Sequence, residues 1–338
     1  MRRAWLGGSL PGTTPTEAIT MALDILGPYL QYMPGGEIGR PDWAASIAQE
    51  LAQQTTHFQP AKAGGWTDYD DMAQLAPLGD LSEVDLGYYR RYQDESPIVA
   101  QLARERRLAL SFQVGIVPPF DLAMIALGLT RHFRQVKPLT KATVREMTNI
   151  YTADETVCFQ LEAPFELCGA LAVPGIARSL ATRKLVRKVI DLVRECPQGM
   201  RFGIHPCLGD FHHKAKGKLP QLTPLVDWVN ELIDQWPGGY TLAYVHLPLA
   251  EGYRPPVTEP GWYVDLARLR VPAGVRVILG CCHEAVTTNE LRPLLTWADG
   301  LLHRTVDVGA SCGLALRGKR TTEDVYTVLN QQAELCRY

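Results

Sequence analysis

The chain has 338 residues, of which 34 are Lys or Arg and 36 are Asp or Glu, so its formal net charge is −2. A nucleic acid or an anionic membrane held by bulk electrostatics needs a basic face, and this balance argues against both kinds of partner. The chain is 46% hydrophobic and 21% charged, which is typical of a globular enzyme with a large core. We therefore expect the function to reside in a local site.

The opening residues and the cysteines indicate the compartment. The apolar part of the segment from Met1 to Gly8 is too short for a signal peptide, and no apolar run approaches the length of about 18 residues that a membrane helix needs. A cytoplasmic location is the expectation. The eight cysteines are then predicted to be free thiols or metal ligands rather than a disulfide framework.

Apolar runs alternate with amphipathic stretches along the whole chain, which predicts repeated strand-then-helix units. Several of the runs are almost continuously apolar, as expected for parallel strands that are covered on both faces. Eight strands are predicted, near residues 4–9, 28–35, 108–116, 156–162, 200–206, 240–247, 274–281 and 301–308.

The helical patterns between these runs complete eight units. They are predicted near residues 15–27, 41–54, 120–133, 140–151, 175–195, 221–236, 287–298 and 321–335. Eight β/α units in a chain of this length predict a (β/α)₈ TIM barrel, with residues 1–338 forming one domain. The doubly wound sheet is the rival architecture, but no G-x-G-x-x-G motif follows the first strand.

Two segments, 55–95 and 249–273, do not fit a minimal barrel. Both mix Pro, acids and aromatics without a sustained period, and we interpret them as long excursions after the second and sixth strands. Long structured loops at the carboxyl end of a barrel commonly build substrate pockets. Four aromatic side chains in these segments either cover a flat ligand or pack the loops: Trp66, Tyr69, Trp262 and Tyr263.

The sharpest local motif is His205-Pro206-Cys207 at the end of the fifth predicted strand. Residues i and i+2 of a strand point to the same side, so the imidazole and the thiol are presented together. This pair is half of a zinc site, since zinc prefers four tetrahedral nitrogen and sulfur ligands. Cys312, after the eighth strand, and His246, at the end of the sixth, lie at the same end of the barrel. The alternative is a buried thiol beside a histidine that the backbone satisfies.

Several motifs in order resemble one enzyme family. Gly7-Gly8-Ser9-Leu10-Pro11 resembles its opening turn, Gly36-Glu37 its Gly-Glu segment, and Gln160-Leu161-Glu162-Ala163-Pro164 its Gln-x-Asp-Glu-Pro strand. His205-x-Cys207, His283 and Cys312-Gly313-Leu314 resemble its zinc motif, a strand-ending histidine and its closing segment. The chain thus resembles the catalytic barrel of cobalamin-independent methionine synthase, in the superfamily that also holds uroporphyrinogen decarboxylase.

The resemblance implies a zinc-dependent alkyl or methyl transfer to a small, amino-acid-like thiol from an alkyl donor. Zinc would keep the bound thiol deprotonated at neutral pH. By position, Ser9, Glu37 and Glu162 take the roles of holding the amino-acid part of the thiol. The chain departs from the family in one ligand, because His246 stands where the family has a glutamate, with Glu251 nearby as a substitute.

Other candidate residues have both a functional and a structural interpretation. His283 and Glu162 are candidates for acid–base catalysis, and Gln113 for substrate binding, but His283 could equally be a packed barrel residue. Glu37 and Glu162 could simply pair with cations such as Arg40. The segment from His212 to Lys218 is predicted to be a solvated loop, placed where an anionic substrate tail would arrive.

We predict zinc ligands at His205, Cys207, Cys312 and His246, and Zn²⁺ as the cofactor. A metal-independent decarboxylase of the uroporphyrinogen type is an alternative, but it needs an arginine-rich opening segment that Gly7 to Pro11 does not provide. A non-catalytic, zinc-stabilised barrel is the other alternative, and a closed zinc coordination sphere would favour it.

Overall fold

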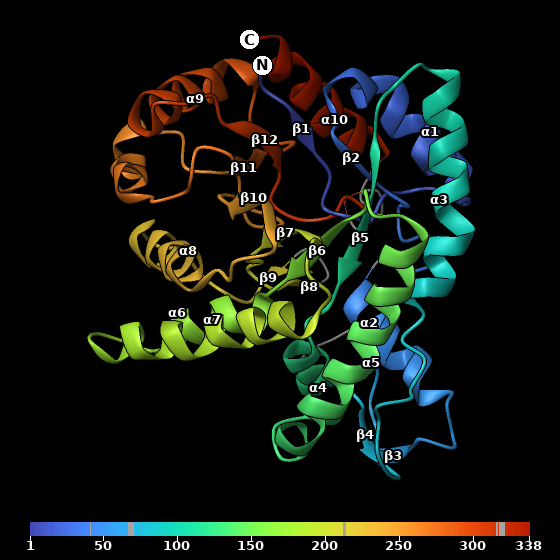
Figure 1. Ribbon diagram of the computed structural model, residues 1–338. Helices are drawn as coiled ribbons and strands as arrows, with labels where there is room; N and C mark the ends of the chain where they lie inside the picture. The colour runs from blue at the N-terminus through green and yellow to red at the C-terminus, as the bar shows by residue number, and fades with distance from the viewer. Residues whose placement is uncertain (41, 67–70, 212–213, 316, 318–321) are drawn as a thin grey trace.

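The computed structural model describes residues 1–338 except 41, 67–70, 212–213, 316 and 318–321. One sheet of eight parallel strands runs in the order β1-β12-β11-β10-β7-β6-β5-β2 and curls into a nearly closed barrel (Figure 1). The strands are β1 Ala4–Trp5, β2 Tyr32–Pro34, β5 Ser111–Ile116, β6 Cys158–Glu162, β7 Arg201–His205, β10 Thr241–Pro248, β11 Arg276–Cys282 and β12 Asp307–Ala310. All eight overlap the predicted segments, so the TIM barrel is confirmed.

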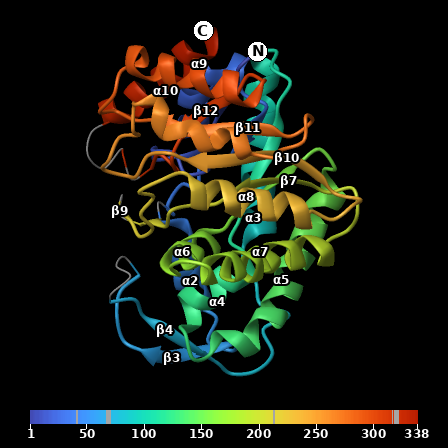
Figure 2. The same ribbon diagram turned by 90° about the vertical axis from the view of Figure 1, so that its left-hand side faces the viewer.

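Eight helical elements surround the sheet, and each packs against the next around the ring (Figures 1 and 2). They are α1 Pro15–Leu26, α3 Tyr88–Glu105, α5 His132–Ala153, α7 Ala177–Glu195, α8 Thr223–Gln235, η2 Pro260–Arg268, α9 Thr288–Leu302 and α10 Thr322–Arg337. The ring position between β10 and β11 is filled by η2, a 3₁₀ helix. The second excursion therefore supplies the outer helix of the sixth unit.

Three strands are each followed by an extra helix before the chain reaches the outer ring. These helices are α2 Trp43–Ala52 after β2, α4 Pro119–Leu127 after β5 and α6 Pro164–Ala172 after β6. The sequence patterns did not predict α6. They predicted α2, near residues 41–54, as the helix of the second unit, whereas the outer helix of that unit is α3. A short helix buries only a narrow apolar stripe, so its period is weak in the sequence.

The first excursion is more regular than predicted. Residues 55–95 contain an antiparallel hairpin of β3 Phe58–Lys62 and β4 Gln74–Pro77, and then the first turns of α3. Pro97 inside α3 and the many charged residues of that helix concealed its period. The predicted end of the excursion at residue 95 consequently falls inside α3, which begins at Tyr88.

The eighth strand begins later than predicted. Residues 301–302 belong to α9, and the chain leaves that helix at His303, which has a φ of 51°. A left-handed residue at this position ends a helix. The apolar pair Leu301-Leu302 packs against the core from the helix rather than from a strand.

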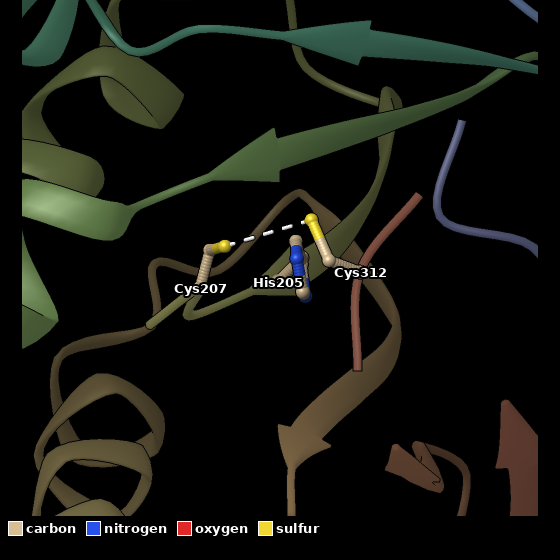
Figure 3. A group of neighbouring side chains, drawn as sticks. All are labelled: His205, Cys207 and Cys312. Atoms are coloured by element: carbon tan, nitrogen blue, oxygen red, sulfur yellow. Dashed lines mark hydrogen bonds between the residues drawn. The ribbon is translucent and has the colours of Figure 1, made fainter. Parts of the chain in front are cut away.

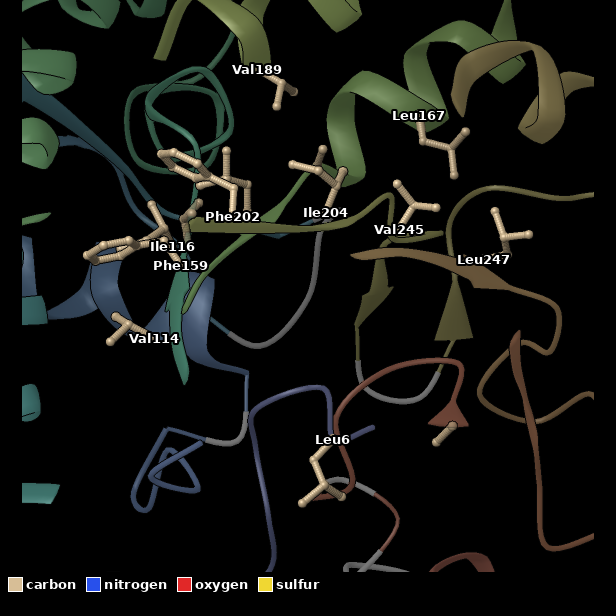
Figure 4. Close-up of a cluster of buried hydrophobic side chains, with 14 of the residues drawn as sticks. Leu6, Val114, Ile116, Phe159, Leu167, Val189, Phe202, Ile204, Val245 and Leu247 are labelled. Carbon is tan, nitrogen blue, oxygen red and sulfur yellow. The ribbon is translucent and has the colours of Figure 1, made fainter. Parts of the chain in front are cut away.

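Apolar residues that pack outward alternate with inward-facing residues along the central barrel strands, and a small second cluster contains Trp5, Tyr32, Cys158, Tyr244 and Ile278. In β6, Phe159 and Leu161 alternate with Gln160 and Glu162, and β7 and β10 follow the same rule, since side chains alternate along a strand. The outward residues form the main core with the helices, as Phe202, Ile204 and Val245 do in Figure 4. The barrel interior is consequently rich in hydrogen-bonding groups.

The aromatic residues of the second excursion pack its loop. Tyr263 is fully buried, and its hydroxyl donates to Val257 O at 2.5 Å. The indole of Trp262 donates to Pro220 O at 3.3 Å. Tyr69 of the first excursion lies outside the described residues.

Among the residues that the structure describes, no helix combines the length and the apolar character needed to cross a membrane.

Candidate metal centre

Strand register places three polar residues in a row at the carboxyl end of the barrel. Glu162 of β6 is opposite His205 of β7, and Ile204 is opposite Val245 of β10. His246 therefore lies beside His205 on the next strand. All three side chains belong to the inward set and are almost completely buried.

His205, Cys207 and Cys312 converge above this row. One ligand atom from each residue lies within 4.8 Å of the other two. The two sulfur atoms are 3.8 Å apart, and the three side chains point toward one another (Figure 3). The structure thus brings together three of the four residues that we predict as zinc ligands.

Two interlocked turns hold Cys312 in this position. A Cβ atom at Gly7 would lie 2.9 Å from Gly313 N, and one at Gly313 would lie 2.1 Å from the Ser9 hydroxyl oxygen. Leu314 N donates to Ser9 O at 2.7 Å. Close approach of two backbones requires residues without a Cβ atom, so the glycines of both motifs place Ser9 next to Cys312.

The donor set fits zinc. One imidazole nitrogen and two sulfur atoms are ligands that zinc prefers, and catalytic zinc sites commonly use three protein ligands with one open position. Cys207 is buried, whereas Cys312 is partly exposed. The same set is poorly suited to Mg²⁺ or Ca²⁺, which prefer oxygen ligands.

The predicted fourth ligand has different contacts. His246 Nδ1 is 2.7 Å from His205 Nδ1, and its Nε2 donates to Ala310 O at 3.0 Å. Glu251 lies 3.8 Å from the Arg254 guanidinium in an ion pair. A fourth protein ligand from either residue stays a prediction.

Glu162 is held by a network of neutral groups inside the barrel. Gln160 Nε2 donates to Glu162 Oε1 at 2.9 Å and to Gly7 O at 2.8 Å. Gln160 Oε1 accepts from Gln113 Nε2 and from the Tyr244 hydroxyl. This network ties the Ser9 turn to the Glu162 carboxylate, so both predicted substrate contacts share one support.

Gln113 is part of that support. Its Nε2 donates to Leu6 O at 2.9 Å, and its Oε1 lies 3.1 Å from the Tyr244 hydroxyl. Burial raises the pKa of Tyr244 well above its usual range, so the phenol is neutral. A direct contact between Gln113 and a substrate stays a prediction.

Glu37 follows β2 and forms an ion pair with Arg40 at 3.1 Å. Its backbone has a φ of 52°, the left-handed region, and the preceding Gly36 O accepts from Leu10 N at 2.8 Å. The turn after β2 therefore packs on the turn that carries Ser9. Pairing with Arg40 was the structural alternative, and substrate binding by Glu37 stays a prediction.

His283 follows β11 and uses both ring nitrogens for the backbone. Its Nδ1 accepts from Ala285 N at 3.1 Å, and its Nε2 donates to Gly252 O at 3.2 Å. These bonds join the end of β11 to the excursion after β10. Catalysis by His283 stays a prediction that has to compete with this structural role.

The sequence patterns missed Glu95 of α3, because that helix was not predicted. Its carboxylate reaches over Gly35, where a Cβ atom would lie 1.6 Å from Glu95 Oε2, and Arg91 is 3.5 Å away. Burial, followed by the nearby charge of Glu37, raises the pKa of Glu95 to about 7. Two consecutive glycines followed by Glu37 are the local signal in the sequence, and Glu95 lies 60 residues downstream of Gly35.

A second pair of carboxyl groups lies under α4 and α6. Asp121 and Glu166 are both fully buried, and Asp121 Oδ1 accepts from Phe165 N at 2.9 Å in the first turn of α6. Asp121 thus caps the following helix rather than its own. Burial raises the pKa of both groups, and the nearby charge of Glu166 raises the pKa of Asp121 further.

His212 and His213 lie outside the described residues. Lys214–Ala215 forms the short strand β9, which pairs with β8 Asp210–Phe211. The predicted role of this segment toward an anionic substrate stays a prediction.

The fold has counterparts among solved structures. A B12-independent methionine synthase from Shewanella sp. W3-18-1, in complex with selenomethionine, aligns with a TM-score of 0.63 at 12% identity, over 99% of this chain and 97% of that chain. A methyltransferase from Methanosarcina mazei aligns with a TM-score of 0.46 at 11% identity, over 96% of this chain and 86% of that chain. No family model and no curated protein sequence matches this chain. At these identities the likeness concerns the fold.

Proposed function

We propose that this chain is a zinc-dependent alkyltransferase that methylates or otherwise alkylates the sulfur of a small, amino-acid-like thiol. The observation that carries the proposal is the convergence of His205, Cys207 and Cys312 at the carboxyl end of the barrel, with ligand atoms within 4.8 Å. Barrel enzymes place their active sites at this end. A methionine synthase shares the fold over almost the whole chain, in agreement with the proposal.

The proposed reaction joins sulfur to carbon. Zinc, when bound, lowers the pKa of a thiol and so supplies a thiolate at neutral pH. The thiol loses its proton, its sulfur forms a bond to the alkyl carbon, and the bond from that carbon to the donor breaks. The electron pair leaves with the donor atom, which takes up a proton.

The side chains around the cluster suit the rest of an amino acid. The Glu162 carboxylate, fixed by Gln160, is a partner for an ammonium group. The Ser9 hydroxyl, beside Cys312, is a donor for a carboxylate. Glu37 belongs to the turn that is hydrogen-bonded to the Ser9 turn, and it is the second acidic group for the ammonium.

The thiol to test first is homocysteine. The solved methionine synthase with this fold carries selenomethionine, the selenium analogue of a methylated homocysteine. An amino-acid thiol also matches the two carboxylates and the hydroxyl described above.

The experiment measures zinc per chain and the zinc-edge X-ray absorption spectrum before and after addition of homocysteine, cysteine and coenzyme M. We expect about one zinc per chain, two sulfur neighbours at rest, and a third sulfur with one of the thiols. Cys312→Ala should bind zinc weakly. Cys196→Ala, which removes a buried thiol at the end of α7, is the matched control and should bind zinc normally.

Two results would contradict the proposal. Zinc bound by four protein ligands that no thiol displaces would indicate a structural site. Absence of zinc from protein purified with zinc would remove the mechanism and bring forward the metal-independent decarboxylase.

A further inference from the structure

His246 lies beside His205 on the neighbouring strand, and its ring contacts His205, Ala310 and Trp5. The Nδ1 atoms of the two rings are 2.7 Å apart. On its other side, His246 Nε2 is 3.0 Å from Ala310 O, the last residue of β12 and two residues before Cys312. The ring therefore bridges β7, which ends at His205, to β12, which precedes Cys312.

The hydrogen-bond chain determines the proton positions on both rings. A carbonyl oxygen only accepts, so Ala310 O requires the proton of His246 to be on Nε2. His246 is fully buried, with the Trp5 indole stacked on it and a second imidazole beside it, and such surroundings disfavour a charged ring. The ring is therefore neutral, and its Nδ1 is an acceptor. His205 must then donate from its own Nδ1 across the 2.7 Å contact. This tautomer leaves a lone pair on His205 Nε2, the atom that a metal takes.

The surroundings of His246 prevent the ring from turning. The indole of Trp5 stacks on it with ring centroids 4.0 Å apart and planes inclined by 24°. Gly280 of β11 borders the ring edge, and a Cβ atom there would lie 2.5 Å from His246 Nε2. His246 is fully buried. A ring confined in this way is suited to orienting a neighbour, and swinging it toward a metal would break the bond to Ala310 O.

We propose that His246 is a positioning residue, which fixes His205 as the Nδ1–H tautomer and directs its Nε2 at the cluster, and that it is not itself a zinc ligand. The inference rests on the proposed function in that it assigns the cluster to zinc. A metal-ligating histidine commonly donates its second ring N–H to an acceptor, and loss of that acceptor costs about 10–100-fold in metal affinity. Here the acceptor is a second imidazole rather than a carboxylate or a carbonyl.

The experiment compares His246→Leu with His246→Asn. Leu removes the acceptor, whereas Asn places a carbonyl oxygen near the position of Nδ1. Zinc affinity, measured by competition with a chromophoric chelator, should fall about 10–100-fold in His246→Leu and much less in His246→Asn. His132→Leu, which removes a buried histidine outside the cluster, is the control for the loss of an imidazole.

Two spectroscopic readouts separate the possibilities. X-ray absorption should count one imidazole on zinc in the wild type and in His246→Asn. Two imidazoles in the wild type and one in both variants would make His246 a ligand, which overturns this inference and leaves the proposed function intact.

The second readout does not depend on zinc. In metal-free protein labelled with ¹⁵N-histidine, the His205 ring should show a protonated Nδ1, and His246→Leu should shift it toward the other tautomer. An Nε2–H tautomer of His205 in the wild type would overturn the inference. If the wild type failed to bind zinc but His205 had the expected tautomer, the proposed function would be contradicted. His246 would then only fix the orientation and tautomer of His205, without a role in metal binding.

Discussion

The interior of the barrel and its carboxyl end use polar groups in opposite ways. In the interior, Gln113, Gln160 and Tyr244 are neutral, and they satisfy one another and the carbonyl groups of the opening turn. At the carboxyl end, an imidazole and two thiols converge on one point, and carboxyl groups are buried close to the strand ends. The comparison shows that a closed hydrogen-bond network provides rigidity, whereas chemistry needs groups that converge on a shared position.

The largest effect is expected from a ligand at the carboxyl end. Zinc binding worth about 10–16 kcal/mol over four ligands makes each ligand worth about 3–4 kcal/mol, or about 10²–10³-fold in affinity. Cys207→Ser should lose that much in a chelator competition, and alkyl transfer should fall with it. Cys196→Ser should retain both properties. Full activity of metal-free protein would refute the assignment of chemistry to this end.

A second test concerns how the free energy of unfolding depends on pH. The group tested is Glu95, whose carboxyl group is buried at the carboxyl end of the barrel, beside the turn that follows β2. Its pKa is raised from 4.5 to about 7 by burial, so the folded state binds the proton more tightly than the unfolded state between these values. The contribution of Glu95 to the free energy of unfolding is therefore fully present at low pH and is lost as the pH rises through about 7. A difference of about 2.5 pKa values corresponds to about 3 kcal/mol.

The measurement is urea unfolding of Glu95→Gln and wild type at pH 5 and pH 8. The variant should gain up to about 3 kcal/mol relative to wild type at the higher pH. Glu105→Gln, on the exposed end of the same helix, should show no such trend. A stability difference that is equal at both pH values would contradict the raised pKa.

A third test breaks the interior network without touching the cluster. Gln160→Leu removes the partner of Gly7 O and one partner each of Gln113 and Tyr244. Leaving buried polar groups unsatisfied should cost about 2–3 kcal/mol in the free energy of unfolding, while zinc per chain should stay near that of wild type. If Gln160→Leu lost zinc while its free energy of unfolding was unchanged, the interior network would be needed for the metal cluster rather than for the stability of the fold.

The smallest effect concerns the contact between the opening turn and Cys312. Gly313→Ala places a methyl group 2.1 Å from the Ser9 hydroxyl oxygen, and such overpacking should cost about 1–2 kcal/mol. Zinc affinity should fall modestly, because Cys312 is displaced. Gly238→Ala, where a Cβ atom meets nothing within 4 Å, is the control. Equal effects of the two substitutions would argue against a special role for this turn.

The strands were the most predictable feature of the fold. Buried parallel strands such as Arg276–Cys282 produce nearly continuous apolar runs, and eight strands with helices between them indicate a barrel by count. Helix α3 was missed because Pro97 and surface charges hide its period. The 3₁₀ helix η2 lies within the predicted second excursion, and its Pro-rich sequence does not reveal that it fills a place in the outer ring.

The candidate site was predictable where it rests on a local motif. His205 and Cys207 share one side of a strand end by simple alternation, and Cys312 follows another strand at the same end. The role of His246 could not be assigned, because its Nδ1 and Nε2 contacts are with residues 41 and 64 positions away. Glu95 could not be found, because its position over Gly35 depends on the packing of an unpredicted helix.

The sequence by itself therefore determined the count and order of the strands, the end of the barrel at which the chemistry-bearing residues gather, and the pair His205-x-Cys207. These features follow from short-range periodicity, which is a property of neighbouring residues. Only the tertiary structure decided which imidazole faces the thiols and which stands behind it, and that Glu95 is held at a strand end. Such choices depend on strand register, on the space left by Gly280 and Gly313, and on burial, all of which arise when distant segments pack together.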